Sequence, residues 1–175
     1  MMSIFTFSKN TFEGQLPGEE TILVTRKHWI FLVLPLFLIF FLGAMILAFT
    51  FWISSFSWYE RFSPIWQFIL SLIFLILWNL GFWWIMIYSL NTIIITNKRI
   101  IENKQLGLFK HIVNELQLKD IQDISVKIIG PFAHLMNYGD IEVQSAGTVA
   151  KFFFNQLPWP EKIKNVIMEQ KIKES

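Results

Sequence analysis

The sequence lacks cysteine and is poor in charge, since charged residues make up only 16% of its 175 residues. The absence of cysteine excludes disulfides, thiolate metal sites and thiol nucleophiles. A soluble domain carries about a quarter charged residues, so the low charge argues against a wholly soluble protein. Two stretches without any charged residue, 28–59 and 62–97, account for the deficit. The net charge of +2 is too small to predict a nucleic-acid partner.

Two long apolar runs lie inside these stretches, at residues 29–53 and 65–88. At about 1.5 Å per residue, a helix of such length covers about 36 Å and can cross a hydrocarbon core of about 30 Å. The sequence therefore predicts two transmembrane helices joined by a short external loop at residues 54–64. The first run is too long, and lies too far from the N-terminus, for a cleaved signal peptide.

Basic residues flank the two runs on the side away from the connecting loop. These residues are Arg26, Lys27, Lys98, Arg99 and Lys104. Arg61 is the only basic residue of the loop itself. Because Lys and Arg are enriched on the cytoplasmic side of a membrane, both termini are predicted to be cytoplasmic.

Small and polar residues within the runs are candidate contacts between the two helices. They are Ala44, Ala48, Gln67, Ser71 and Asn79. Small residues let helices approach closely, and an amide adds an interhelical hydrogen bond of about 1 kcal/mol. The alternative is a polar path or a docking site for another subunit. Neither run contains an ionisable residue, which argues against proton or ion transport.

After residue 88 the pattern changes to short β-rich runs with turn residues between them. The predicted strands are residues 90–96, 99–104, 110–118, 121–129, 140–145 and 149–154. Pro160 suits the first turn of a helix, and apolar residues at helical spacing predict an amphipathic helix over 160–173. The sequence therefore predicts a mainly-β domain over 89–175, a small barrel or sandwich covered by the closing helix.

Residues 1–28 are predicted to form a cytoplasmic N-terminal segment. The run at residues 4–7, Ile-Phe-Thr-Phe, is either a short strand that docks on the barrel or a disordered tail. The sequence leaves both alternatives open.

Several segments, taken in order, resemble bacterial PH-like domains of the YdbS type, once called a domain of unknown function. They are YSLNTIIITNKRII at 88–101, LQLKDIQDISV at 116–126, YGDIEV at 138–143 with SAG at 145–147, and PGEE at 17–20 ahead of RKHW at 26–29. The resemblance covers about residues 14–170. It implies a seven-stranded, partly open PH-like barrel with a C-terminal helix, a place in the bacterial plasma membrane, and no established enzymatic activity.

One turn of the predicted barrel is a candidate lipid contact, formed by Lys104, Leu106, Leu108, Phe109 and Lys110. A strand of seven or eight residues that starts at the membrane ends roughly 25 Å away, and the next strand returns. The turn between 104 and 110 then lies near the bilayer, where lysines attract anionic headgroups. The alternative is an ordinary hairpin with Leu108 and Phe109 folded into the barrel core.

Candidate catalytic residues and cofactor sites are absent from the sequence. His28, His111 and His134 lack the spacing of metal ligands, and no serine lies in a nucleophile elbow. Glu115, Asp120 and Asp123 are predicted to be a solvated surface rather than a metal site. We therefore expect no enzyme, cofactor or metal, but a module that binds a protein partner or itself at the bilayer. The alternative is a sensor of anionic membrane lipid.

Overall fold

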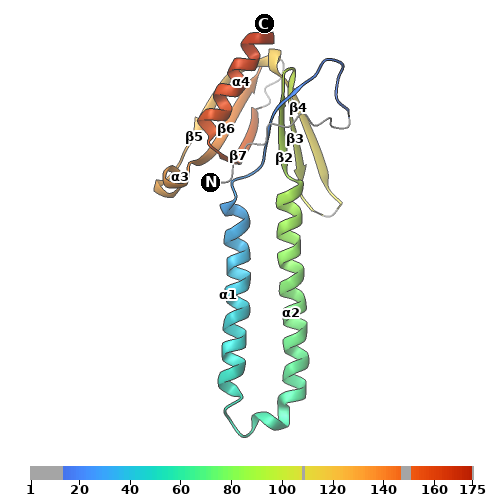
Figure 1. The fold of residues 1–175 in the computed structure, drawn as a ribbon, viewed down its shortest axis with the longest axis vertical. Helices are drawn as coiled ribbons and strands as arrows, with labels where there is room; N and C mark the ends of the chain where they lie inside the picture. The colour runs from blue at the N-terminus through green and yellow to red at the C-terminus, as the bar shows by residue number, and fades with distance from the viewer. Residues whose placement is uncertain (1–13, 108, 147–150, 175) are drawn as a thin grey trace. The chain divides into compact units, whose positions relative to one another are not determined.

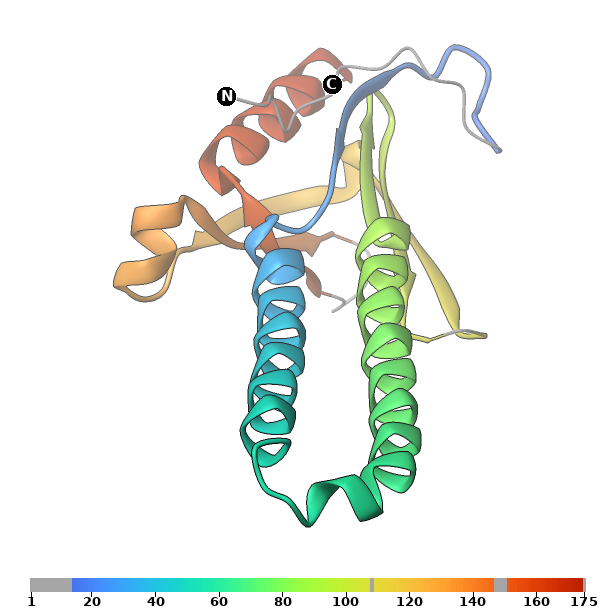
Figure 2. The ribbon, with the colours of Figure 1, turned by 60° about the horizontal axis from the view of Figure 1, so that its bottom comes forward.

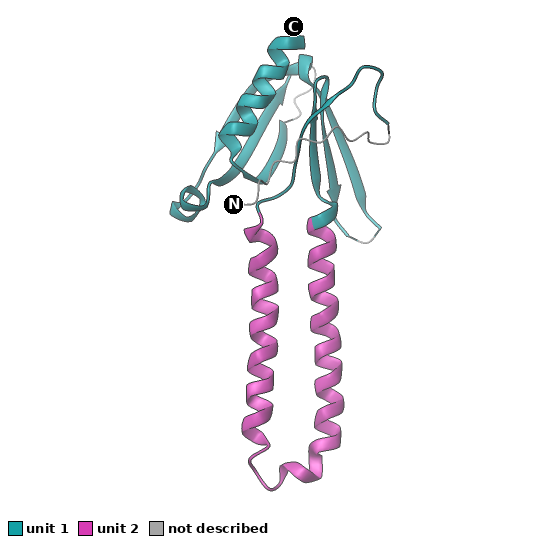
Figure 3. Cartoon of the chain, in the orientation of Figure 1, with its two compact units in different colours: residues 1–28, 89–175 teal, residues 29–88 magenta. Residues whose placement is uncertain are grey.

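The computed structural model describes residues 14–107, 109–146 and 151–174. The chain divides into two compact units, which Figure 3 colours separately. Residues 1–28 and 89–175 form one, here named the β unit, and residues 29–88 form the other, the hairpin unit. Residues 14–28, from the predicted N-terminal segment, group with the β unit. The run at residues 4–7 lies outside the described residues.

The hairpin unit consists of two helices, α1 (Ile30–Ile53) and most of α2 (Tyr59–Leu90). Both are long and apolar enough to cross a membrane. The predicted loop at 54–64 shortens to residues 54–58, because α2 begins before Pro64. Proline cannot donate to the carbonyl four residues earlier, and the Ser63 hydroxyl donates to that Glu60 carbonyl instead, at 3.0 Å.

The β unit holds two antiparallel sheets, with strand orders β1-β2-β3-β4 and β5-β6-β7 (Figure 1). The first contains β1 (Thr21–Thr25), β2 (Thr92–Thr96), β3 (Arg99–Gln105) and β4 (His111–Gln117). The second contains β5 (Ile121–Lys127), β6 (Tyr138–Ser145) and β7 (Lys151–Pro158). A 3-10 turn η1 (Leu118–Asp120), a short helix α3 (Pro131–Met136) and the closing helix α4 (Pro160–Glu174) complete it. The six predicted strands and the closing helix are thus confirmed, with shifted ends.

Strand β1 was not predicted from the sequence. It pairs with β2 in antiparallel register, with Val24 opposite Ile94. The whole hairpin unit is therefore inserted in the connection between two neighbouring strands. The β-branched run TILVT was the local signal, but its partner strand lies more than sixty residues away in sequence.

The core of the β unit lies between the two sheets and α4. Its fully buried side chains include Ile95, Leu118 and Ile141 from the strands and the 3-10 turn. Helix α4 contributes Ile163 and Ile167 and packs against η1, β5 and β6. The apolar stripe predicted for this helix is confirmed, and it covers the side of the core that the strands leave open.

Candidate functional site

The strand register defines two ends of the β unit. Thr25 pairs with Ile93, and Thr92 pairs with Asn103. The end of β1, the start of β2 and the β3–β4 turn therefore share one end. We call it the proximal end, because the chain continues from it into α1 and α2. The β2–β3 turn lies at the opposite, distal end, as the strand lengths predicted.

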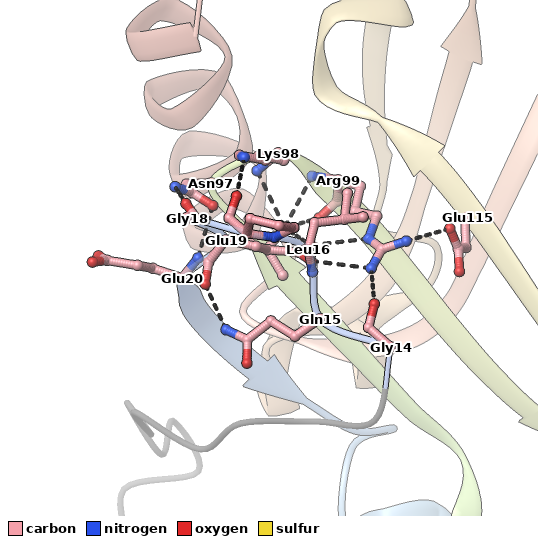
Figure 4. Close-up of polar contacts among 12 residues, drawn as sticks. Gly14, Gln15, Leu16, Gly18, Glu19, Glu20, Asn97, Lys98, Arg99 and Glu115 are labelled. Carbon is pink, nitrogen blue, oxygen red and sulfur yellow. Dashed lines mark hydrogen bonds and ion pairs between the residues drawn. The ribbon is translucent and has the colours of Figure 1, made fainter.

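A polar network around Glu19 occupies the distal end (Figure 4). The Glu19 carboxylate, in a residue only 4% exposed, accepts from Arg99 Nε at 2.9 Å and from the Thr96 hydroxyl at 2.9 Å. Arg99 also donates to Glu115 at 2.7 Å and to the Gly14 carbonyl. The network therefore ties the segment before β1 to the turn between β2 and β3.

The other residues of the β2–β3 turn serve the same structural purpose. Lys98 Nζ donates to the Pro17 carbonyl at 2.7 Å, and Asn97 donates to the Gly18 carbonyl at 3.1 Å. The Glu20 amide in turn donates to Asn97 Oδ1 at 2.9 Å. The basic β2–β3 turn therefore binds the segment that precedes β1 in the same chain. Sequence analysis missed this role of the Pro-Gly-Glu-Glu segment, whose only signal was its place in the family resemblance.

Charge in this network is stabilised by hydrogen bonding. Burial by itself would raise the pKa of Glu19, but hydrogen bonds from Arg99, the Leu16 amide and the Thr96 hydroxyl outweigh it and lower that pKa. The Glu19 carboxylate correspondingly raises the pKa of Arg99 through their hydrogen bond. The pair is therefore ionised on both sides at neutral pH.

The β3–β4 turn carries the predicted lipid contact at the proximal end. Phe109 is 100% exposed and Leu106 is also exposed, while Leu108 lies outside the described residues. The alternative in which Phe109 folds into the core is therefore wrong. Lys110 is exposed and Lys104 half-buried, so the structure brings both lysines to the base of this apolar tip.

The connection between β1 and α1 is held by the second sheet. The amide of His28, a buried residue, donates to the Gln156 carbonyl at 2.7 Å, and its ring lies 5.6 Å from that of Tyr138. Gln156 has φ +62° and Trp159 has φ +50°, values that non-glycine residues rarely adopt. The Asp140 carboxylate accepts from the Gln156 amide at 2.8 Å and helps hold that conformation.

Burial of His28 predicts acid sensitivity of the β unit. Burial lowers the pKa of His28, against a smaller opposing effect from a hydrogen bond to the Met136 backbone. A histidine with a lowered folded-state pKa stabilises the fold above its unfolded value, about 6.5, and that contribution is lost as the pH falls. We expect the urea midpoint of the β unit to fall between about pH 7.5 and pH 5.5, and to fall less in His28→Gln. An equal fall in both proteins would contradict this assignment.

Of the residues predicted to contact across the two apolar helices, only Ala44 lies between them in the structure. Asn79 is exposed and donates to the Leu75 carbonyl of its own helix at 2.8 Å, and Ser71 donates to Phe68 in the same way. Ala48 and Gln67 are exposed, while Ala44 lines an apolar groove of about 490 Å³ between the helices. An interhelical hydrogen bond from Asn79 was therefore the wrong expectation, because its amide donates to a backbone carbonyl one turn away in the same helix instead.

Different residues form the contacts between these helices. The position where a Cβ of Gly43 would lie is 3.4 Å from the Phe74 ring. Trp66 Nε1 donates to the Thr50 hydroxyl at 3.2 Å. The small residue that matters for approach is thus a glycine, and the polar contact comes from a tryptophan.

A substitution at Asn79 tests this correction. We expect Asn79→Leu to change the stability of the hairpin unit by less than about 1 kcal/mol, since its amide makes no interhelical bond. Thr50→Val removes a real interhelical bond and should cost about 0.6 kcal/mol. Unfolding by sodium dodecyl sulfate in mixed micelles measures both. A larger loss for Asn79→Leu than for Thr50→Val would contradict the structure.

Candidate metal ligands do not converge in the described part of the chain. Among residues 14–107, 109–146 and 151–174, no three His, Asp or Glu side chains are placed to hold a metal ion. Glu115 pairs with Arg99, and Asp123 Oδ1 accepts from the Ile124 amide at 2.8 Å. His111 and His134 are exposed.

Comparison with known proteins finds a partial likeness among solved structures. No protein-family model and no curated protein matches the sequence. Among solved structures, the chain is similar to a DUF1696 family protein with a pleckstrin-homology domain from Shewanella loihica PV-4. The two share 18% identity over 46% of this chain and 70% of that chain, with a TM-score of 0.39. At these values the likeness assigns neither a family nor a function.

Proposed function

We propose that this chain is a non-catalytic, membrane-anchored PH-like module that mediates protein interaction or assembly at the inner face of the bacterial plasma membrane. The observation that carries the proposal is the distribution of exposed apolar side chains. They cover both long helices and recur on the β unit. Among the described residues, the exposed large apolar side chains of the β unit are Leu16, Leu90, Leu106, Phe109, Val113, Ile129, Phe132, Leu135, Phe153, Met168 and Ile172.

Exposure of the two helices supports membrane anchoring. Only 6% of the most apolar window of each helix is buried. A core helix of a soluble protein passes the same test of length and composition, but most of its surface is buried. Phe40 and Trp78, each 76% exposed, have no protein to cover them within the described chain. A lipid bilayer would cover all these side chains at once.

The chain has no cysteine, so single thiols test the proposed orientation. Ser57, in the loop between α1 and α2, and Gln144, on β6, are both exposed. In intact cells an impermeant maleimide should label Ser57→Cys and leave Gln144→Cys unlabelled. Permeabilised cells provide the control, because both thiols should then react. Labelling of Gln144→Cys but not Ser57→Cys in intact cells would show the opposite orientation and contradict the proposal.

Exposed apolar patches on a folded unit mark interaction surfaces, whereas several charged groups of the β unit form ion pairs within it. Arg99 pairs with Glu19, and Glu142 pairs with Lys127 at 2.5 Å and Lys151 at 2.7 Å. Purification in mild detergent tests the interaction directly. We expect a stoichiometric partner, or a mass above that of one chain, measured by light scattering. A monodisperse monomer without a partner, both in detergent and after cross-linking in native membranes, would contradict the proposal.

The alternative function, binding of anionic membrane lipid, is favoured by the exposed tip at Phe109 with Lys110 beside it. Reversing the charge of both lysines should weaken this contact, so the informative variant combines Lys104→Glu with Lys110→Glu. A fragment starting at residue 89 would lack β1, and the full chain in lipid nanodiscs is therefore needed. A dye at Phe109→Cys should shift to the blue in anionic but not neutral nanodiscs, and the double substitution should abolish the difference.

A further inference from the structure

Helix α3 presents an apolar surface that the β unit does not use. Ile129, Phe132 and Leu135 are 78%, 52% and 74% exposed. The one buried residue of the helix, Ala133, is enough to pack it against the end of β6. The large apolar side chains therefore point away from the core and contribute little to folding of the unit.

This surface lies at the proximal end of the β unit. The ring of Tyr138, two residues after α3, lies against His28, and His28 hydrogen-bonds to the Met136 backbone at the end of α3. His28 is two residues before α1 begins at Ile30. The segment that leads into the first apolar helix is thus bound directly to the base of α3.

A second apolar tip lies at the same end. Within the β unit, α3 and the β3–β4 turn project on opposite sides of the proximal end (Figure 2). That turn exposes Leu106 and Phe109. A bilayer is a flat surface that can receive both tips together.

The charge of the surrounding segment suits an anionic bilayer. Residues 128–139, which include α3, contain no Asp or Glu, and Lys127 just before them is paired with Glu142. Acidic headgroups would repel carboxylates, so their absence from this segment lets the apolar surface meet the bilayer. Apolar side chains on a short element with this charge are typical of interfacial contacts.

We propose that α3 and the residues just before it insert Ile129, Phe132 and Leu135 into the boundary between headgroups and acyl chains of the adjoining leaflet. The insertion holds the β unit at a second point, apart from its covalent connections to the two helices. This inference rests on the proposed membrane anchoring, and its test separates the two.

Depth-dependent quenching in nanodiscs tests the inference on the full chain. An environment-sensitive dye is attached to Leu135→Cys, to Ile172→Cys near the C-terminal end of α4, or to Phe40→Cys in α1. All three native side chains are exposed, so their replacement removes no core packing. Nitroxide groups are placed either high on the acyl chain or at its end. A dye on an element buried about 5–10 Å into the interface should lose about half of its fluorescence when the nitroxide is high on the acyl chain. It should lose less when the nitroxide is at the end of the acyl chain.

The three positions give distinct results. We expect strong quenching of a dye at positions 135 and 40 and no quenching at position 172. Quenching at 40 with equal, weak quenching at 135 and 172 would overturn insertion of α3 and leave membrane anchoring standing. No quenching at position 40 would overturn both proposals. A blue-shifted but unquenched dye at 135 would assign this surface to a protein contact and also overturn the proposal.

A matched pair of substitutions provides an independent check. Phe132→Ser removes one inserting side chain, so quenching at position 135 should fall by about half or more. Phe153, on β7, is exposed to nearly the same degree as Phe132. Phe153→Ser should leave quenching at position 135 unchanged. Equal effects of the two substitutions would contradict insertion by α3.

Discussion

Replacing Glu19 by alanine is expected to lower the free energy of unfolding of the β unit by about 3–5 kcal/mol, because it leaves a largely buried guanidinium without its one buried carboxylate partner. The Arg99 side chain is only 11% exposed, and it makes two hydrogen bonds to the Glu19 carboxylate, at 2.9 and 3.0 Å. The Thr96 hydroxyl loses an acceptor in the same variant. Urea-dependent pulse proteolysis of the full chain in detergent measures the loss.

Glu115 provides the matched control, because it pairs with the same arginine from a half-exposed position. Exposed ion pairs contribute about 0–1 kcal/mol, so Glu115→Ala should shift the midpoint little. Similar losses of unfolding free energy in the two variants would contradict a larger contribution from the buried Glu19 pair. The lowered pKa of Glu19 adds a pH signature. Its contribution is present above the unfolded carboxyl pKa of about 4.3 and is lost as the pH falls through the lowered folded value.

Gly139→Ala is expected to destabilise the β unit by about 1–3 kcal/mol through overpacking. A Cβ at this position would lie 2.7 Å from the Lys127 carbonyl oxygen, 3.0 Å from Ile128 Cγ1 and 3.1 Å from Pro160 Cγ. The nearest atom belongs to the backbone of β5, so it cannot move aside as a side chain would. The strand pairing of β5 with β6, or the start of α4, must shift instead.

Gly107→Ala is the control for this prediction. No atom lies within 4 Å of the position that its Cβ would occupy, and its φ is not positive. The same substitution should therefore change stability by no more than about 0.5 kcal/mol. Both variants can be compared by urea midpoint in the same detergent. Equal midpoints would show that the β5–β6 pairing tolerates a methyl group at Gly139.

Local patterns in the sequence were sufficient for most elements. Two charge-free apolar runs predicted both long helices, and alternating residues such as Ile141 and Val143 predicted the strands that follow them. The helix after Pro160 was predicted by apolar spacing, and Ile163 and Ile167 are buried as expected. These features depend on neighbours within a few residues, so periodicity alone reveals them.

Contacts between distant residues could only be decided by the tertiary structure. The carboxylate of Glu19 meets Arg99 across eighty residues of sequence, and β1 finds β2 across the inserted hairpin unit. The amide of Asn79 is satisfied within its own helix, a choice that composition does not reveal. Sequence by itself thus determined both apolar spans, the closing helix and every strand except β1. Which side chains are buried together, and which apolar tips remain exposed at the proximal end, depended on long-range packing, because such contacts leave no local periodicity.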